Sequence, residues 1–439
     1  MSLNHLLRLH KLAIPNLART MANFVIEPSK MKHVITPELE KLVSLFKKYN
    51  YEVRIAGGAV RDLLSGEKIP EDVDLATVAT PQQMKVMFAK ESIRTINEQG
   101  EKHGTVTVRI DDRTNFEVTT LRIDKVTDGR HAEVEFTTDW VLDSERRDLT
   151  INSMFLSMDG TVHDFFNGKE DLEKKRIAFV GSADARIKED YLRILRYFRF
   201  YGRIGDSSND NHEEVTMEAI RQNAVGLQRI SGERIWSEWK KILSGPMGGP
   251  LTIKMVELGL SPYIGLPENP DVQELQRIWD LQKNTLHYVT LLSHLLRSQD
   301  EMNKLNLRLK MSAYERDLGM FLLQHRDAVQ TLKYWQKVFI MTKLKPASVR
   351  EWIVEAMRSK NMNDLVLEFQ QWEVPYFPIS GSDLKAEGVS PGKSIGFCLN
   401  FLKEAWIDSD FSLDRDHLLK VELPKACDAY FDLSPRSRK

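Results

Sequence analysis

The sequence predicts an α+β protein in which a mixed β-sheet with flanking helices is followed by an all-α part. Between about residues 51 and 180, short runs rich in β-branched residues alternate with helical patterns. From about residue 186 the strand-like runs fade, and amphipathic segments joined by polar loops predict successive helices. These observations favour a sheet-containing domain at the N-terminus and helical domains after it.

The expected elements follow one another along the chain. Strand-like runs occupy residues 51–57, 72–77, 92–96, 105–110 and 115–123, with one helix through Arg61 and another after Pro81. Helices are expected over residues 186–203, 217–228 and 232–245. Polar loops at 207–211, 244–250 and 265–270 divide the helical half.

The composition excludes several classes of protein. Lys and Arg total 62 and Asp and Glu total 63, so the chain is neither a uniformly basic nucleic-acid coat nor an acidic tail protein. Cys398 and Cys427 show neither zinc-site spacing nor a disulfide framework, which favours a reducing compartment. Charged residues interrupt every apolar run before about 18 residues, so we expect no association with a membrane.

The first 26 residues contain basic residues but no acidic one, and leucines give one helical turn an apolar face. Such a segment is typical of a mitochondrial transit peptide, which we expect over residues 1–30. A disordered tail is the alternative. Met21 and Met31 are downstream starts that would produce a cytoplasmic or nuclear form.

Two carboxylates and two glycines form the most informative pattern. Asp72 and Asp74 lie two residues apart on an expected strand, so their side chains point to the same face. Two like charges this close need a cation, and Mg²⁺ prefers carboxylate and phosphate oxygens. Gly57 and Gly58 lie at a strand-to-helix turn, where a phosphate can approach backbone N–H groups. The pattern predicts a magnesium and phosphate site, whereas either half alone is more often a turn or a solvated face.

Two further stretches are rich in arginine. Arg147 and Asp148 precede an apolar run, where an N-cap acid with solvated arginines is the plain interpretation. On a helix through residues 186–203, four arginines form one stripe and apolar residues fill the opposite arc. The stripe consists of Arg193, Arg196, Arg199 and Arg203. A solvated basic face is the plain interpretation of this helix too.

Together these stretches resemble the motifs of a known enzyme family. GGAVRD at 57–62, followed by DVD at 72–74, resembles motif A of the nucleotidyltransferase superfamily, in particular class II tRNA CCA-adding enzymes and bacterial poly(A) polymerases. RRDLTIN at 146–152 resembles motif B, and EDYLR at 189–193 resembles motif D. The resemblance implies catalytic, metal-binding roles for Asp72 and Asp74, and nucleotide-binding roles for Gly57, Gly58, Arg61, Arg147, Asp148, Asp190, Arg193, Arg196 and Arg199.

The chemistry of base selection can be derived from the motif D residues. Cytosine and adenine each present an amino donor beside a ring-nitrogen acceptor, whereas uracil and guanine present a carbonyl beside an N–H group. A carboxylate with a guanidinium therefore complements C and A. Asp190 would accept a hydrogen bond from the amine, and Arg193 would donate one to the ring nitrogen.

Other segments give weaker indications. Glu117 alternates toward the sheet face and is a candidate third carboxylate. Residues 121–140 are similar to the family's flexible loop, although a solvated hairpin is the plain interpretation. Lys393 follows a glycine-rich turn and could contact a tRNA phosphate, with a C-capping turn as the alternative. His163 next to Asp164 suggests a phosphohydrolase pair, but the strand-like context favours a structural role.

The resemblance implies a nucleotidyltransferase head over residues 31–185, a helical neck over 186–265, and a helical body and tail over 266–439. It also implies that the chain adds C, C and A to tRNA from CTP and ATP, with Mg²⁺ as cofactor. The alternatives are a poly(A) polymerase and a catalytically silent tRNA-binding protein.

Overall fold

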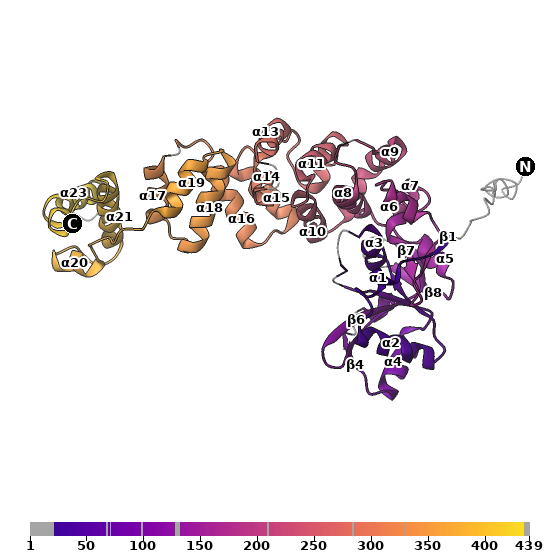
Figure 1. Cartoon of the computed structure of the whole chain (residues 1–439). Coiled ribbons are helices and arrows are strands. Elements are labelled where there is room, and N and C mark those ends of the chain that lie inside the picture. The colour runs from indigo at the N-terminus through magenta and orange to yellow at the C-terminus, as the bar shows by residue number, and fades with distance from the viewer. Residues whose placement is uncertain are drawn as a thin grey trace, which may run out of the picture. The chain divides into compact units, whose positions relative to one another are not determined.

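The computed structural model describes residues 22–433 except 67–68, 71, 98–99, 128–131, 209, 283–284 and 330. Residues 1–21, which include Met21 and most of the expected transit peptide, lie outside the described residues. Contacts divide the chain into two units, Met1–Gly265 and Leu266–Lys439. Figure 1 shows the first unit from indigo to rose and the second from salmon to yellow.

The first unit contains the strands of the protein's described part. They are β1 (Ala22–Val25), β2 (Val53–Ala56), β3 (Leu75–Thr77), β4 (Arg94–Asn97), β5 (Thr105–Ile110), β6 (Thr114–Thr120), β7 (Arg122–Thr127), β8 (Ala132–Phe136), β9 (Phe155–Leu156) and β10 (Thr161–Asp164). Across these described residues, eight strands form one sheet in the order β1-β10-β9-β2-β3-β6-β5-β4, and β7 and β8 form a separate hairpin. Strand β3 runs parallel to β6 and antiparallel to β2, so the prediction of a mixed sheet is confirmed.

The helices of the first unit flank the sheet and then continue beyond it. They are α1 (Pro28–Met31), α2 (Pro37–Lys48), α3 (Gly58–Ser65), α4 (Pro81–Lys90), α5 (Trp140–Glu145), α6 (Gly168–Glu173), α7 (Ala183–Glu189), α8 (Arg193–Ile204), α9 (Glu214–Asn223), α10 (Gly232–Leu243), α11 (Gly248–Glu257) and α12 (Ser261–Ile264). Local sequence explains where the sheet-covering helices begin. The side chains of Thr36 and Thr80 cap α2 and α4 by accepting hydrogen bonds from backbone N–H groups of the first turn, and a proline follows each cap.

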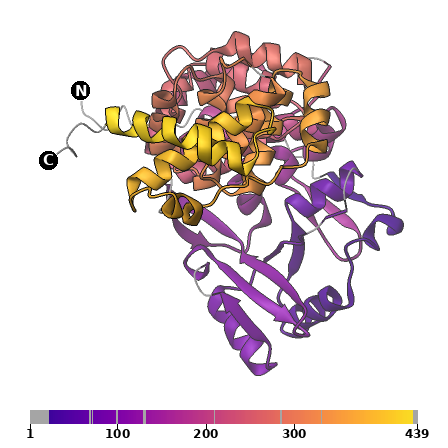
Figure 2. The same ribbon diagram turned by 90° about the vertical axis from the view of Figure 1, so that its left-hand side faces the viewer.

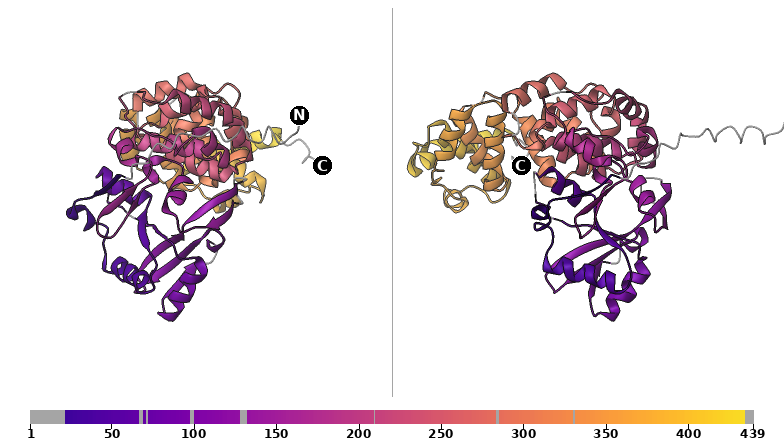
Figure 3. Two further views of the ribbon diagram at one scale, coloured as in Figure 1. Left: turned by 90° about the vertical axis from the view of Figure 1, so that its right-hand side faces the viewer. Right: turned by 45° about the vertical axis from the view of Figure 1, so that its right-hand side comes forward.

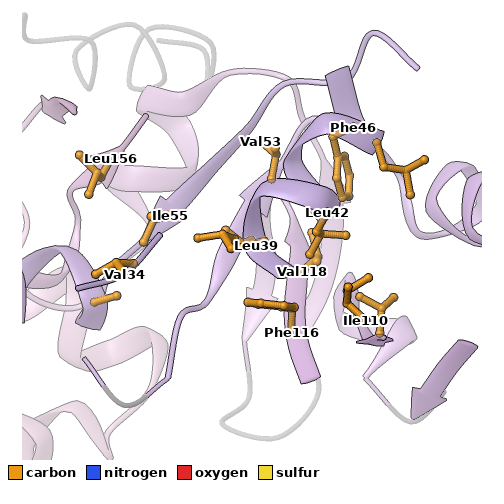
Figure 4. Close-up of a cluster of buried hydrophobic side chains, with 14 of the residues drawn as sticks. Val34, Leu39, Leu42, Phe46, Val53, Ile55, Ile110, Phe116, Val118 and Leu156 are labelled. Atoms are coloured by element: carbon orange, nitrogen blue, oxygen red, sulfur yellow. The ribbon is translucent and has the colours of Figure 1, made fainter. Parts of the chain in front are cut away.

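The main core lies between one face of the sheet and helices α2 and α4, which lie together against it (Figures 1 and 2). Leu39, Leu42 and Phe46 of α2 pack on Phe116 and Val118 of β6, as Figure 4 shows. Because side chains alternate along a strand, Glu117 points from β6 to the opposite face, where it is exposed. This face of the sheet is therefore free of the main core.

The expected helix over residues 186–203 is interrupted, which corrects the prediction of one continuous helix. Helix α7 ends at Glu189, Asp190 is extended, and α8 begins at Arg193. The Asp190 carboxylate accepts the N–H of Leu192, 3.1 Å away, and its carbonyl accepts the N–H of Arg193. This local side-chain bond competes with helical hydrogen bonding and starts a new helix.

The amphipathic pattern of α8 is confirmed. Ile194, Leu195, Phe198 and Tyr201 are buried beneath the helix. The aromatic side chains of α8 also contact one another and His212, so the apolar arc fixes how the helix is rotated. The arginine stripe consequently faces away from this core.

Residues 22–31 form part of the head fold. Residues 22–30 belong to the expected transit peptide, and the expected head begins at residue 31. Strand β1 pairs antiparallel with β10, and the N–H of Ile26 donates to Gly160 O at 3.0 Å. Ile26 and Met31 are both buried in the main core. The segment is thus an edge strand followed by a core-forming turn.

We expect a chain that starts at Met31 to be less stable than one that starts at Met21. Loss of β1 exposes the edge of β10, and loss of the Ile26 side chain alone costs about 2–5 kcal/mol. The melting temperature of the head should fall by roughly 5–20 °C in a calorimetric comparison. Equal melting temperatures for the two chains would show that β1 contributes little.

The described part of the second unit is helical (Figure 3). Its helices are α13 (Val272–Gln282), α14 (Tyr288–His294), α15 (Gln299–Leu309), α16 (Ala313–Gln324), α17 (Leu332–Met341), α18 (Pro346–Ser359), α19 (Asn363–Gln371), α20 (Gly381–Ala386), α21 (Lys393–Asp408), α22 (Arg415–His417) and α23 (Leu423–Leu433), with a π-helical turn at Leu418–Glu422. The prediction of an all-α second half is confirmed. Among the described residues, none of the helices combines the length and apolar character that crossing a membrane requires.

Candidate active site

A cavity of about 940 Å³ opens on the face of the sheet opposite the main core and is also lined by α8. It brings together twelve of the predicted site residues: Gly57, Gly58, Arg61, Asp72, Asp74, Glu117, Arg147, Asp148, Asp190, Arg193, Arg196 and Arg199. Among its described lining residues are nine arginines and lysines and five carboxylates. The excess of positive charge suits a polyanionic ligand such as a nucleoside triphosphate.

The glycine turn holds the backbone in a conformation that other residues rarely adopt. Gly57 has φ +61°, and a Cβ atom there would lie 3.0 Å from Nη1 of Arg147. The N–H of Gly57 donates to Met154 O, which ties the turn to the motif B segment. Gly58 begins α3 and lines the cavity, so the N-terminal end of this helix, with its positive dipole end, lies at the cavity wall. A larger residue at Gly57 would strain the turn and displace Arg147.

The two aspartates lie just before β3, because the strand begins at Leu75 and not at Asp72. The sheet pairing nevertheless extends to Asp74, since the N–H of Ala56 donates to Asp74 O at 2.9 Å. Leu75 pairs in parallel with Val118, so Asp74 lies beside Glu117 at the next register position. All three carboxylate residues are exposed to the cavity.

The electrostatics of Asp74 favour binding of a cation. Partial burial raises the pKa of the Asp74 carboxyl, and the negative charges of Glu117 and Asp72 raise it further. A divalent cation would relieve this repulsion, and carboxylate oxygens are the ligands that Mg²⁺ prefers. Among the described residues, no three His, Cys, Asp or Glu side chains converge as a complete metal site. The two aspartates thus fit a cation that takes its other ligands from the substrate phosphates and water.

A buried carboxylate that sequence reasoning missed anchors the motif B arginines. Asp143 is 1% exposed and accepts hydrogen bonds from Arg146 Nε at 2.8 Å and Arg147 Nη2 at 3.1 Å. It also accepts the backbone N–H of Arg122 at 3.0 Å. Burial alone would raise the pKa of Asp143, but the two guanidinium groups hold it below its usual value. Arg147 also lies over the Phe155 ring, so its orientation is fixed from two sides.

Asp148 connects the head to the arginine helix. Its Oδ2 accepts from Arg196 Nε at 2.6 Å, and its Oδ1 accepts the N–H of Leu149 at 2.9 Å. Although burial would raise the pKa of Asp148, the Arg196 guanidinium holds it below its usual value. The interpretation of Asp148 as only an N-cap residue is therefore insufficient, because its carboxylate also positions Arg196, which lines the cavity.

The motif D side chains are also held by partners. Asp190 Oδ2 accepts from Arg234 Nη2 at 2.7 Å. Arg193 forms an ion pair with Glu189, and its Nη2 donates to the carbonyl of Arg146 at 2.9 Å. Both side chains still line the cavity. Asp190 and Arg193 are thus oriented before any ligand arrives.

A cluster of guanidinium groups around one aromatic ring was also not predicted. Arg61, Arg196 and Arg199 lie over the buried ring of Phe200, at 4.9, 5.7 and 4.5 Å from its centroid. Burial lowers the pKa of Arg61, while the adjacent Asp62 carboxylate opposes that shift. The ring face helps to hold several like charges together where phosphates would approach. An aromatic residue inside the arginine stripe was the signal that could have indicated it.

The remaining predicted residues lie outside this cavity. Lys393 is exposed at the first position of α21 in the second unit, directly after Gly392, which has φ +116°. His163 bonds with Ser157, and Asp164 caps the start of α6, so the structural interpretation of this pair is confirmed. Residues 121–140 contain the β7–β8 hairpin, whose tip at 128–131 lies outside the described residues.

Comparisons with known proteins identify the family of the chain. A family model described as "Poly A polymerase head domain" matches residues 53–178, and one described as "Probable RNA and SrmB- binding site of polymerase A" matches 212–269. The chain is 50% identical over 414 residues to a Mus musculus protein named "CCA tRNA nucleotidyltransferase 1, mitochondrial", covering 92% of this chain and 94% of that protein. A Danio rerio protein of the same name is 48% identical over 411 residues, with 92% and 94% covered.

The fold is also that of solved structures. A Bacillus stearothermophilus CCA-adding enzyme in complex with CTP matches with a TM-score of 0.70 at 24% identity, covering 91% of this chain and all of that one. The structural match at 24% identity shows the fold alone, whereas 48–50% identity over 92% of the chain shows the family. The chain therefore belongs to the CCA tRNA nucleotidyltransferase family.

Proposed function

We propose that this enzyme adds C, C and A to the 3′ end of tRNA, using CTP and ATP and releasing pyrophosphate. One observation supports the proposal most: Asp72 and Asp74 line the same basic cavity as Asp190 and Arg193. The tRNA 3′-hydroxyl attacks the α-phosphate in line with the leaving pyrophosphate, so the protein mainly positions reactants and neutralises charge.

The proposed metal ligands are Asp72 and Asp74, with Mg²⁺ as the cation and Glu117 as a candidate third carboxylate. When bound, a divalent cation supplies charge neutralisation at the phosphates and a lower pKa for the attacking hydroxyl. The raised pKa of Asp74 supports this assignment, because a crowded carboxylate gains most from a cation.

The proposed phosphate-binding groups surround that pair. The helix end at Gly58 offers backbone N–H donors, and Arg61 and Arg147 offer guanidinium groups held in fixed orientations. Arg196 and Arg199 extend the positive wall along α8. Through its bond to Arg196, Asp148 acts as a positioning group for this wall.

The proposed base-reading groups are Asp190 and Arg193. Asp190 accepts a hydrogen bond from the exocyclic amine of C or A, and Arg193 donates to the adjacent ring nitrogen. Arg234 holds the Asp190 side chain and Glu189 holds the Arg193 side chain. The two groups therefore have fixed orientations in which they can pair with a base without a nucleic-acid template.

We place the enzyme in the mitochondrion, with a second form in the cytoplasm or nucleus if translation starts at Met21 or Met31. The acid-free N-terminus and the names of the vertebrate relatives support the mitochondrial assignment. Because β1 belongs to the head sheet, processing before Ala22 would leave that sheet intact.

The test is incubation with labelled CTP or ATP and a tRNA that lacks its 3′ end. Incorporation of C, C and A followed by a stop supports the proposal. A long A tail would indicate a poly(A) polymerase, and binding of tRNA without incorporation would indicate a silent binding protein.

The proposal for Lys393 predicts a change in the salt dependence of tRNA affinity. If its ammonium group contacts a phosphate, Lys393→Ala should flatten the slope of log K against log salt by about one unit or less. Binding titrations across a salt series measure the slope. Lys174→Ala is the control, because Lys174 is an exposed lysine paired with Glu170 on α6. An unchanged slope for Lys393→Ala would show that Lys393 contacts no phosphate and is a solvated residue at the start of α21.

A further inference from the structure

The chain contains two cysteines in 439 residues, and the fold brings both to one apolar cluster. Cys398 lies on α21 and Cys427 on α23, two helices that pack together in the second unit. Cys398 belongs to the apolar cluster of this region, and Cys427 packs on the same cluster. Cys427 lies close enough to Cys398 to shift the pKa of the Cys398 thiol.

The two thiols differ in access. Cys398 is 1% exposed, whereas Cys427 is partly exposed. Burial and the neighbouring Cys427 together raise the pKa of the Cys398 thiol to about 11, with burial the larger cause, so Cys398 stays protonated and protected at neutral pH. Cys427 is therefore the thiol that a reagent in solution reaches first, with Cys398 next to it inside the core.

We propose that Cys398 and Cys427 form a reversible disulfide that joins α21 to α23 when the protein meets a low-molecular-weight disulfide such as oxidised glutathione. The Cys427 thiolate attacks one sulfur of the reagent, forming a mixed disulfide and releasing one reduced glutathione. Cys398 then loses its proton and attacks the Cys427 sulfur, releasing the second glutathione. Two protein thiols are oxidised, and one oxidised glutathione is reduced to two thiols.

The bond would change the C-terminal helices and not the cavity in the head. It would close a loop from α21 through the π-helical turn to α23, which restricts the unfolded chain and stabilises this helical cluster. The start of α21, where Lys393 lies, would then be tied to the last helix of the described chain.

The test uses the full-length native protein with oxidised glutathione, followed by acid quenching, alkylation of free thiols and mass spectrometry. We expect a monomer that has lost two hydrogens and takes up no alkylating reagent. A tryptic digest should contain peptide 394–403 linked to peptide 426–436, and dithiothreitol should separate them.

Two variants make the result decisive. Cys398→Ala keeps an apolar side chain in the core, and we expect it to stop at a single stable glutathione adduct on Cys427. Cys427→Ser should remain unmodified, because its remaining thiol is buried; circular dichroism of both variants checks their folding. An unreactive native protein, a stable mixed disulfide in the native protein, or disulfide-linked dimers would each overturn the proposal.

Discussion

Asp74→Asn is expected to abolish the addition of both C and A while leaving the fold and tRNA binding largely intact. The change removes a charged ligand but no core volume, because Asp74 is exposed to the cavity. Loss of a preorganised electrostatic group at a reacting centre commonly costs about 10²–10³-fold in rate, and loss of the metal itself costs more. Asp72→Asn should behave alike in single-turnover extension assays with CTP and with ATP.

A binding measurement separates loss of metal from loss of fold. Mg²⁺ should raise the melting temperature of the wild-type protein, because a cation that binds the folded state stabilises it, and should not raise that of Asp74→Asn. The effect should weaken as pH falls, since the raised pKa of Asp74 lets protons compete with the cation at a higher pH than for an ordinary aspartate. Asp112→Asn, an exposed aspartate on the β5–β6 turn, is the control. Near-normal turnover in Asp74→Asn would refute the metal assignment.

Asp190→Ala is expected to reduce the discrimination between nucleotides more than it reduces addition itself. C and A both need an acceptor for their amine, and a good bidentate contact is worth roughly 1–3 kcal/mol, or about a tenfold to hundredfold preference. The ratios of CTP to UTP and of ATP to GTP incorporation should fall by that factor, even as the total rate drops. Single-nucleotide extension with each triphosphate separately measures these ratios.

The structure adds a reason to expect a lower rate as well. Removal of the Asp190 carboxylate takes one partner from Arg234 and removes the side-chain bond to the Leu192 N–H, which weakens the turn before α8 and so the support of Arg193. Asp184→Asn, a change at a partly exposed position on the preceding helix α7, controls for general effects on this region. A slow Asp190→Ala enzyme that keeps the wild-type ratios would place base selection elsewhere and leave Asp190 with a capping role.

The parts of the site that sequence predicted depend on short-range periodicity. The two-residue spacing of Asp72 and Asp74 predicts that they lie together, and both line the cavity although they precede β3. The arginines of α8 share a face because a helix repeats about every 3.6 residues. These rules need no knowledge of the tertiary structure. The structure shows that these residues line one cavity. Their roles in catalysis stay predictions.

The parts that sequence missed depend on contacts between distant segments. Asp143 looks like an ordinary helical aspartate until folding buries it beneath Arg146 and Arg147. The interruption at Asp190 arises because a local carboxylate bond outcompetes helical bonding, which periodicity does not register. The edge strand at Ala22–Val25 lies within a segment whose composition is that of a targeting sequence, so only its partner strand reveals it.

That edge strand also sets an order of events for folding. Ala22–Val25 pair with Thr161–Asp164, and β10 in turn pairs with β9, which is the neighbour of β2. The first strand of the described chain therefore has no partner until some 140 residues after it have been synthesised. Pairings of such large sequence separation form slowly, because the entropy of closing the intervening loop is lost before the contact is gained. During synthesis β1 therefore stays unpaired until β10 has been made, and the β1 edge is the last part of the sheet to be completed.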